Sequence, residues 1–241
     1  MEWLRELLQL VAPERCHGCG RDMTSLADPE PFCAKCFESI SAANQPSCLR
    51  CGAPIEIDGH LPIEGCGACF REKLAFQKCW RFGAYDGDLR NLVLRCKRQG
   101  GEILAESVGF MMGKALSRQV RISKPHALVA VPSHWTKRLA RGHNPALGLA
   151  KGISRFTGIA CQSRWLFKKR RSPSQTSLPP SLRKKLGVEM FQATIPQANQ
   201  GCAIWLVDDV LTTGATASAC ASALLKAGAR EVVPVVLARG G

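Results

Sequence analysis

The residues best suited to chemistry form one short string, Asp208-Asp209-Val210-Leu211-Thr212-Thr213-Gly214-Ala215-Thr216. Two adjacent carboxylates at the end of a buried strand cost free energy unless a ligand binds them. Their oxygen atoms can accept hydrogen bonds from ribose hydroxyls or bind a hydrated magnesium ion. Thr212, Thr213 and Thr216 surround the expected start of a helix, whose N–H groups can bind phosphate, and Gly214 would let the backbone approach that phosphate closely. A helix capped by Thr and Asp is the plainer alternative. The whole string is more specific than a cap, so we predict a phosphate site over residues 208–216.

Eight of the thirteen cysteines form four pairs, each with a two-residue spacer. Such a pair lets both thiolates face one ion, and two pairs complete a closed tetrahedral zinc site. There are 13 residues between Cys19 and Cys33 and 14 between Cys51 and Cys66, and either gap fits one zinc ribbon. These near-equal gaps favour sequential pairing over a cross-brace in which the pairs alternate. We therefore predict two structural zinc ions, one held by Cys16, Cys19, Cys33 and Cys36 and one by Cys48, Cys51, Cys66 and Cys69.

The charge balance separates this cysteine module from the rest of the chain. Residues 1–78 hold 8 Lys and Arg against 11 Asp and Glu, a balance of 8 − 11 = −3, and residues 79–241 hold 25 against 8, a balance of 25 − 8 = +17. Phosphate attraction needs Lys and Arg, so we favour a structural role for the module over nucleic-acid binding. We predict one unit over residues 1–78 and a second over residues 79–241. The other cysteines lack partners at this spacing and are predicted to be ordinary buried thiols: Cys79, Cys96, Cys161, Cys202 and Cys220.

The string that begins at Asp208 must be positioned by an α/β fold. Apolar runs at 127–131, 203–207 and 231–237 predict buried parallel strands, and strand–helix–strand order predicts a mostly parallel sheet flanked by helices. Ligands of such sheets bind beyond the carboxyl ends of the strands, where the acids follow residue 207. The remaining predicted elements are helices at 3–11, 86–98, 102–118, 144–157 and 214–228, the last closed by Gly228, a strand at 164–167 and a mobile basic loop at 168–181.

The composition excludes several classes of protein. Hydrophobic residues make up 46% of the 241, which argues against wholesale disorder. No apolar run reaches the roughly 18 residues of a membrane span, and the N-terminus lacks the long apolar segment of a secretory signal. We therefore expect a cytoplasmic protein without membrane insertion, in which abundant cysteine indicates metal rather than disulfides.

Read together, the motifs resemble one family along essentially the whole chain. The string from Asp208 is similar to the phosphoribosyl-pyrophosphate (PRPP) motif of type I phosphoribosyltransferases, and the zinc module before it is typical of their ComF branch, the competence protein F family. Further similar blocks are Tyr85 to Arg90, Lys97 to Gly100, Val131-Pro132 with Lys137-Arg138 and Arg141-Gly142-His143-Asn144, and Ser174 to Phe191. The chain departs from the family at Pro145, where Gln is usual, and near Leu186-Gly187, where Asn is usual.

The resemblance implies a type I phosphoribosyltransferase-like domain that binds PRPP, or a nucleoside monophosphate, with magnesium. It implies displacement of pyrophosphate at the anomeric carbon of ribose, with the acceptor left unnamed. The catalytic contacts would come from Asp208, Asp209 and Arg141. The rest of the PRPP site would be Thr212, Thr213, Gly214, Ala215, Thr216, Lys137 and Arg138. We interpret His143 as a loop residue rather than a general base. The family's association with natural transformation suggests DNA uptake, or else nucleotide metabolism, as the setting.

A second interpretation from another class stays open. Residues 164–185 carry eight Lys and Arg and no acid, beside Trp165 and Phe167. Cations with neighbouring aromatic rings can bind single-stranded DNA by charge and stacking. The alternative is thus a non-catalytic module that senses PRPP or binds single-stranded DNA beside DNA-uptake proteins.

Overall fold

The computed structural model describes residues 15–23, 32–41, 46–55, 65–67, 69–70, 72–122, 124–133, 141–169 and 190–240. Its main sheet has the order β1 (Trp80–Ala84), β6 (Glu231–Arg239), β5 (Ala203–Leu211), β2 (Ala127–Ala130), and all neighbouring strands are parallel. A parallel bridge from Leu128 to Cys161 extends pairing beyond β2. The carboxyl ends of these strands therefore lie along one edge, which we call the carboxyl edge.

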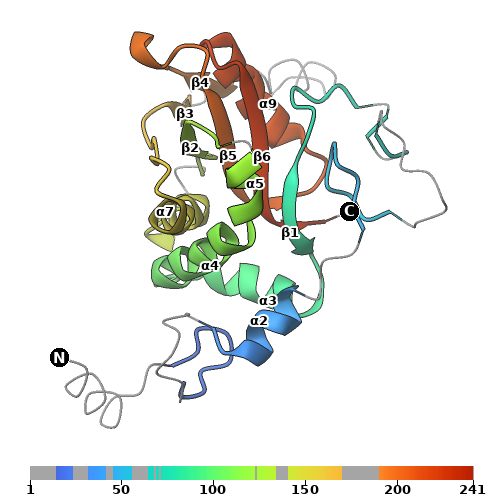
Figure 1. Ribbon diagram of the computed structural model, residues 1–241, viewed down its shortest axis with the longest axis vertical. Coiled ribbons are helices and arrows are strands. Elements are labelled where there is room, and N and C mark those ends of the chain that lie inside the picture. The colour runs from blue at the N-terminus through green and yellow to red at the C-terminus, as the bar shows by residue number, and fades with distance from the viewer. Residues whose placement is uncertain are drawn as a thin grey trace, which may run out of the picture.

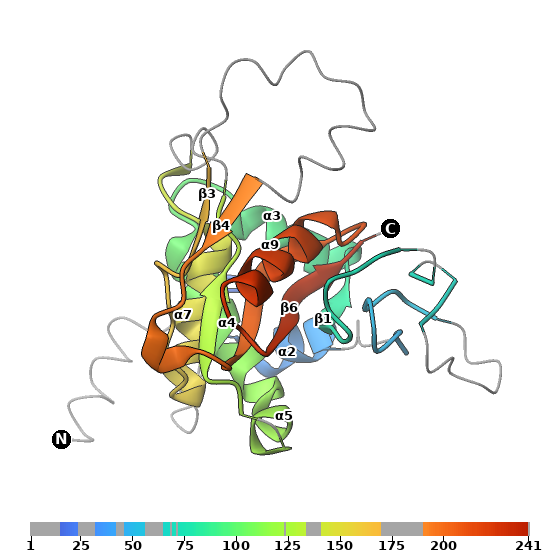
Figure 2. The same ribbon diagram turned by 90° about the horizontal axis from the view of Figure 1, so that it is seen from above.

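Helices cover both faces of the sheet (Figures 1 and 2). One face packs against α3 (Gly87–Cys96), α4 (Glu102–Ala115) and α7 (Pro145–Thr157). The other packs against α9 (Ala215–Lys226) and the antiparallel pair β3 (Leu166–Lys168) and β4 (Phe191–Ala193). Successive side chains of β5 point to opposite faces of the sheet. Trp205 and Val207 pack on the side of α3, α4 and α7, and Ile204 and Leu206 pack on the side of α9. The remaining elements are α2 (Ala34–Ser41), α5 (Ser117–Ile122) and the short η3 (Gln197–Asn199).

Close contact between α4 and α7 depends on glycine. A Cβ atom at Gly152 would collide with the backbone carbonyl of Glu106, and one at Gly109 would collide with that of Leu149. At the start of α7, the side chain of Asn144 accepts a hydrogen bond from Ala146 N at 3.2 Å and donates one to Val131 O at 3.0 Å. Asn144, the last residue of the family-like block at 141–144, therefore caps α7 and ties it to the end of β2.

Most predicted elements are confirmed, with shifted ends. The predicted helix at 102–118 is two helices, α4 and α5, and the helix at 3–11 lies outside the described residues, as does nearly all of the loop at 168–181. The prediction that the central strand ends at Val207 is wrong, since β5 continues to Leu211. It does so because β6 stays paired beside it through the Leu211–Arg239 register. Asp208 and Asp209 thus lie within the strand rather than beyond it.

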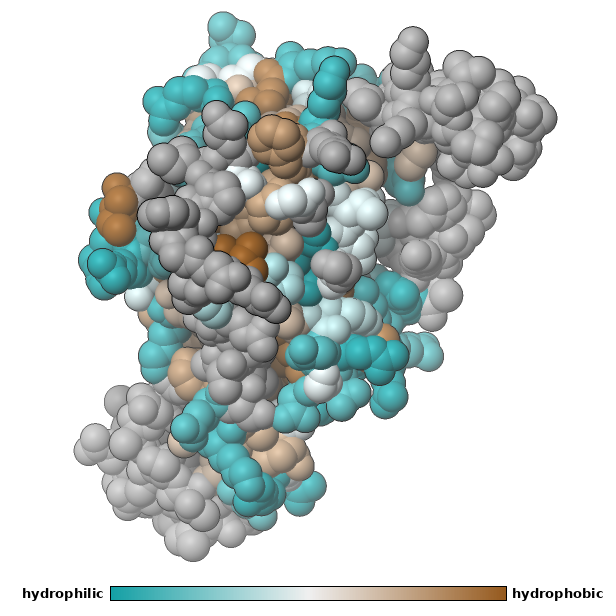
Figure 3. Space-filling view, turned by 90° about the vertical axis from the view of Figure 1, so that its right-hand side faces the viewer, coloured by the Kyte–Doolittle hydropathy of each residue, from teal (hydrophilic) through white to brown (hydrophobic). Residues whose placement is uncertain are grey.

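No helix within the described ranges is long and apolar enough to cross a membrane. On the face shown in Figure 3, the brown hydrophobic side chains of described residues appear as separate spots among teal hydrophilic ones.

Candidate functional site

The eight cysteines of the N-terminal module gather into two clusters. Cys16, Cys19, Cys33 and Cys36 form one and Cys48, Cys51, Cys66 and Cys69 the other, with the sulfur atoms of each cluster within 4.8 Å of one another. Sequential pairing is therefore confirmed over the cross-brace. The two turns are alike, since Gly20 N donates to Cys16 O and Gly52 N to Cys48 O, both at 2.8 Å. Four thiolates converging on one point are the donor set of a closed structural zinc site.

We call the first cluster with its turns ribbon 1 and the second ribbon 2; they pack on different parts of the α/β unit. In ribbon 1, the His17 ring lies 2.8 Å from Ser107 Oγ on α4, and Arg95 of α3 donates to the carbonyls of His17 and Gly18. In ribbon 2, all four cysteines are buried, and its chain runs beside β1 (Figure 1). The net charge of −3 over residues 1–78 is unfavourable for binding nucleic acid and is consistent with a structural role for the two zinc ribbons.

We expect purified protein, kept reduced and free of chelator, to contain two zinc ions per chain. Elemental analysis by plasma mass spectrometry measures this directly. A content well under one zinc per chain would contradict the assignment, and a single zinc would leave one ribbon without metal.

Of the five cysteines outside the clusters, four are buried and Cys161 is half-buried. Burial raises the pKa of Cys79 and of Cys96 to about 12. A thiol with so high a pKa carries almost no thiolate at neutral pH and is a poor nucleophile. Their interpretation as ordinary buried thiols is confirmed for Cys79, Cys96, Cys202 and Cys220.

The two acids of the string point to opposite faces of the sheet. Lys97, which follows the end of α3, places its Nζ atom 3.0 Å from Asp209 Oδ1. Asp208 lies on the α9 side, where its charge helps to raise the pKa of the Cys220 thiol further than burial alone. The two carboxyl groups are therefore not equivalent, and Asp209 already has a cationic partner.

Asp208 is held in an environment that disfavours its charge. Burial, followed by the nearby charge of Asp209, raises its pKa to about 8, although Asp209 N donates a hydrogen bond to Asp208 Oδ1 at 2.8 Å. In the unliganded protein the protonated form of this carboxyl is therefore more favourable than it is for an ordinary Asp. Perturbation of this kind at the ligand edge of a sheet is typical of functional carboxyl groups.

The loop from Thr212 to Gly214 joins β5 to α9. Gly214 has φ of 80°, a left-handed conformation that side chains rarely adopt, and it is the N-cap of α9. Thr213 Oγ1 accepts a hydrogen bond from Ala215 N at 3.3 Å, while Thr212, Thr213, Ala215 and Thr216 are exposed. This geometry presents exposed hydroxyls and first-turn N–H groups together, as an anion site at a helix start requires.

The block at 141–144 reaches the same edge through His143. The His143 side chain is buried, with Nε2 2.8 Å from Cys96 O and Nδ1 3.0 Å from Arg141 O. Both ring nitrogens are engaged by backbone carbonyls, which supports a loop-holding role rather than proton transfer to a ligand. Arg141 is described and partly exposed, whereas Lys137 and Arg138 lie outside the described residues.

Two basic residues near this edge were missed as site residues. From the sequence, Lys97 is only part of the family-like block at 97–100, and Arg239 lies beyond the strand predicted at 231–237. Each acts through a partner more than 25 residues away in the chain, and neither periodicity nor a local motif signals such contacts. Conversely, Trp165 is only 6% exposed, so its predicted availability for base stacking is wrong; Phe167, at 42%, is exposed.

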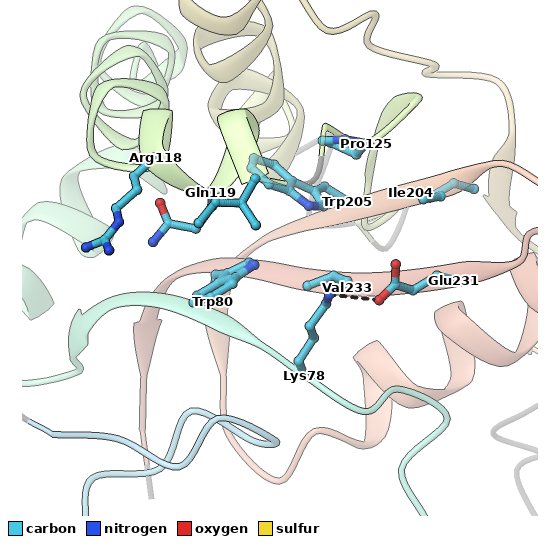
Figure 4. A pocket seen from close by; sticks show the side chains of 11 residues that line it. Lys78, Trp80, Arg118, Gln119, Pro125, Ile204, Trp205, Glu231 and Val233 are labelled. Atoms are coloured by element: carbon cyan, nitrogen blue, oxygen red, sulfur yellow. Dashed lines mark ion pairs between the residues drawn. The ribbon is translucent and has the colours of Figure 1, made fainter.

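A cavity of about 290 Å³ lies at the opposite, amino end of the sheet (Figure 4). Trp80, Val233 and Trp205 line its floor, Gln119 faces them from α5, and an ion pair of 2.9 Å joins Lys78 and Glu231 beside it. It contains neither the paired acids nor the threonine loop. We therefore regard the carboxyl edge as the candidate site.

Comparison with known proteins bears on both parts of the chain. The family model "Double zinc ribbon domain" matches residues 7–76. The "DNA utilization protein YhgH" of Salmonella typhi is 30% identical over 188 residues, which span 77% of this chain and 80% of the relative. The chain belongs to the ComF family. "Competence protein F" of Haemophilus influenzae is 25% identical over 212 residues, 86% of this chain and 90% of that relative.

Solved structures also overlap this ComF family chain in part. The glutamine PRPP amidotransferase of B. subtilis aligns with a TM-score of 0.38 and 24% identity over 56% of this chain and 27% of that one. A purine phosphoribosyltransferase of Pyrococcus horikoshii aligns with a TM-score of 0.33 and 20% identity, covering 53% and 71%. At these TM-scores the overlaps add nothing to the sheet order. The predicted architecture, a mostly parallel α/β sheet flanked by helices after a small zinc-ribbon module, is confirmed by the described elements and the ribbon match.

Proposed function

We propose that the carboxyl edge binds PRPP, or a nucleoside monophosphate with the same ribose and 5-phosphate. The observation that carries this proposal is the junction of β5 with α9, where the half-buried acid Asp208 precedes an exposed threonine loop and the left-handed Gly214. A helix start alone would suit many anions. An adjacent carboxyl that is costly to ionise favours a ligand that also brings hydroxyls or a bound cation.

The roles follow the geometry. Thr212, Thr213, Gly214, Ala215 and Thr216 would hold the 5-phosphate through hydroxyl and N–H groups. Asp208 would accept hydrogen bonds from ribose hydroxyls or contact the hydrated magnesium that accompanies PRPP, which suits an oxygen donor. Asp209, neutralised by Lys97, would orient the hydroxyls from the other face. Arg141, with Lys137 and Arg138, would contact the pyrophosphate.

In a transferase reaction, a nucleophilic atom of the acceptor would bond to the anomeric carbon as the carbon–oxygen bond to pyrophosphate breaks. The bonding electrons leave with pyrophosphate, so negative charge grows on that group. Arg141 and the neighbouring cations would stabilise it, alongside the magnesium carried by PRPP. Asp208 and Asp209 would hold the ribose as its ring gains positive character.

The names of these relatives support a biological setting for the proposed activity. Proteins named for DNA utilization and competence suggest that this chain acts in DNA uptake or in the nucleotide metabolism that follows it. A cytoplasmic location stays a prediction, as does the division of the chain after residue 78.

Calorimetric titration with PRPP and magnesium tests the binding proposal. We expect saturable binding that weakens strongly when magnesium is chelated. Pyrophosphate release with a panel of bases then separates a transferase from a PRPP sensor, which would bind without turnover. Absence of binding to PRPP and to nucleoside monophosphates, by zinc-loaded protein, would contradict the proposal.

Arg141→Ala is expected to weaken PRPP binding about tenfold or more, near 1.4 kcal/mol, and ribose 5-phosphate binding much less. The reason is that only PRPP carries the pyrophosphate group. Arg155→Ala is the control, because Arg155 is an exposed arginine of α7 that pairs with Glu106 at 3.7 Å. Equal weakening of both ligands by Arg141→Ala would remove this arginine from the pyrophosphate side.

One feature of the described residues favours a second candidate function, single-stranded DNA binding. Phe167 is exposed, and the neighbouring Lys168 places its Nζ atom 5.6 Å from the Phe191 ring centre. An exposed ring beside cations suits base stacking. DNA affinity that falls steeply with salt and is unaffected by changing Asp208 would favour this function over the PRPP proposal.

A further inference from the structure

Ribbon 2 contacts the candidate phosphate loop by two separate routes. The first is the segment that leaves its last cysteine. Arg50 donates to Cys69 O at 3.2 Å and to Glu72 O at 3.3 Å, which fixes the chain as it leaves the cluster. Leu74 packs against the buried cysteines of ribbon 2. The path of residues 72–76 is therefore set by ribbon 2.

The same segment lies on the loop. A Cβ atom at Gly214 would be 3.2 Å from Leu74 Cδ2 and 3.8 Å from the ring of Phe76. Next to this contact, Ala75 N donates a hydrogen bond to Ser218 Oγ of α9 at 2.9 Å. Phe76 is 2% exposed and belongs to the core beneath α9. Residues 74–76 thus support Gly214 and the first turn of α9.

The second route passes through Arg239, a buried arginine at the end of β6. Its Nε donates to Cys51 O of ribbon 2 at 3.1 Å, and its guanidinium also donates to Leu211 O at 3.3 Å. Gly240 N donates to the same Leu211 carbonyl at 2.9 Å. Leu211 is the last residue before Thr212, so Arg239 connects the zinc turn to the start of the loop.

The charge of the zinc site in ribbon 2 should affect the stability of the buried Arg239 cation. Four thiolates with one Zn²⁺ carry a net charge of 2 − 4 = −2, whereas four neutral thiols carry none. The hydrogen bonds of Arg239 to described residues go to backbone carbonyls, which do not cancel a buried positive charge. A buried charge without a counter-charge is costly. A zinc-filled ribbon 2 would therefore stabilise the Arg239 bridge as well as the fold of residues 72–76.

Ribbon 1 has no comparable connection within the described parts of the chain. Its hydrogen bonds to the α/β unit go to Ser107 of α4 and Arg95 of α3. We propose that zinc in ribbon 2 positions the loop Thr212–Gly214 and the start of α9, while zinc in ribbon 1 does not. The consequence for ligand affinity rests on the proposed function, but the ordering of the loop does not.

A matched pair of variants tests this. Cys51→Ser and Cys19→Ser each alter the second cysteine of the first pair in one ribbon, and each should lower the zinc content by about one ion. Hydrogen exchange of peptides covering residues 209–218 should speed up at least tenfold in Cys51→Ser and change less than twofold in Cys19→Ser. Affinity for PRPP with magnesium should fall at least tenfold only in Cys51→Ser. Equal effects of the two variants on the loop, or none from Cys51→Ser, would overturn the proposal.

A second pair guards against simple unfolding of ribbon 2. Arg239→Met keeps side-chain volume but removes charge and donors, whereas Arg239→Lys keeps the charge. With two zinc ions retained, the Met variant should show the fast exchange of residues 209–218 and the Lys variant should restore part of the protection. Parent-like exchange in the Met variant would overturn the Arg239 route. If the parent protein does not bind PRPP, the proposed function fails, while the exchange measurements still decide the coupling.

Discussion

Replacing Asp208 with Asn is expected to stabilise the unliganded protein at pH 7 to 8 while it removes PRPP binding. Burial and Asp209 raise the pKa of Asp208 to about 8, so ionisation of this carboxyl opposes folding. Asn imitates the protonated form and never ionises. We expect at least about 1 kcal/mol of added stability at pH 8, since one pKa unit corresponds to about 1.4 kcal/mol. The same change removes the carboxylate that the ligand would use, so affinity should fall at least tenfold.

The sign of the pH dependence follows from the same pKa. An unfolded Asp has a pKa of about 3.9, whereas burial and the charge of Asp209 raise the pKa of Asp208 to about 8 in the folded protein. Between these values the folded state holds one more proton, so the free energy of unfolding falls as pH rises through this window. Urea unfolding between pH 6.5 and 8.5 should show this fall in the parent and a flatter profile in Asp208→Asn.

Asp209→Asn is the matched control. It removes the ion pair with Lys97, so it should lower stability. It also removes one cause of the raised pKa of Asp208, so the fall in stability should move to lower pH but persist, because the Asp208 carboxyl is still present. If Asp208→Asn is no more stable than the parent and keeps the same profile, the pKa of Asp208 is not raised in the folded protein.

The second large effect is expected from Gly214→Val. This position has φ of 80°, and a new Cβ would lie 3.2 Å from Leu74 Cδ2. A β-branched residue is strained at such a φ and would push the loop away from residues 74–76. We expect at least a hundredfold loss of PRPP affinity, about 2.7 kcal/mol, with both zinc ions retained. Calorimetry and elemental analysis measure the two quantities.

Gly201→Val separates loop strain from general strain. Gly201 also has a positive φ, 73°, but nothing lies within 4 Å of its Cβ position. It should lose stability through the same backbone strain and still bind PRPP like the parent. Similar binding losses in both variants, or parent-like binding by folded Gly214→Val, would show that the loop is not the phosphate site.

The zinc module could be predicted almost completely from sequence, because metal geometry ties residue type to spacing. The same holds for buried strands, whose apolar runs are local. The end of β5 could not be predicted from sequence. Asp208 and Asp209 are residue types typical of loops, but pairing with β6 keeps them in the strand. Likewise, Trp165 appears available beside basic residues but is buried where the β3–β4 pair packs on α9.

The site itself was only partly predictable. The string at 208–216 is a local pattern that the sequence shows directly, and its role as a phosphate site stays a prediction. The ion pair of Lys97 with Asp209 joins positions 112 residues apart, 209 − 97, and leaves no pattern in the sequence. The connection of ribbon 2 to Leu211 through Arg239 is equally remote. The roles of Arg141, Lys137 and Arg138 stay predictions.

The central claim is that residues 212–216 hold the 5-phosphate of a phosphoribosyl ligand. A crystal structure of the zinc-loaded protein grown with PRPP and magnesium tests it most directly. The account predicts the 5-phosphate within hydrogen-bond distance of the Thr212–Thr216 hydroxyl and N–H groups, with the ribose hydroxyls facing Asp208. A well-ordered ligand bound elsewhere, such as in the cavity beside Trp80 and Trp205, with residues 212–216 free of phosphate, would contradict it.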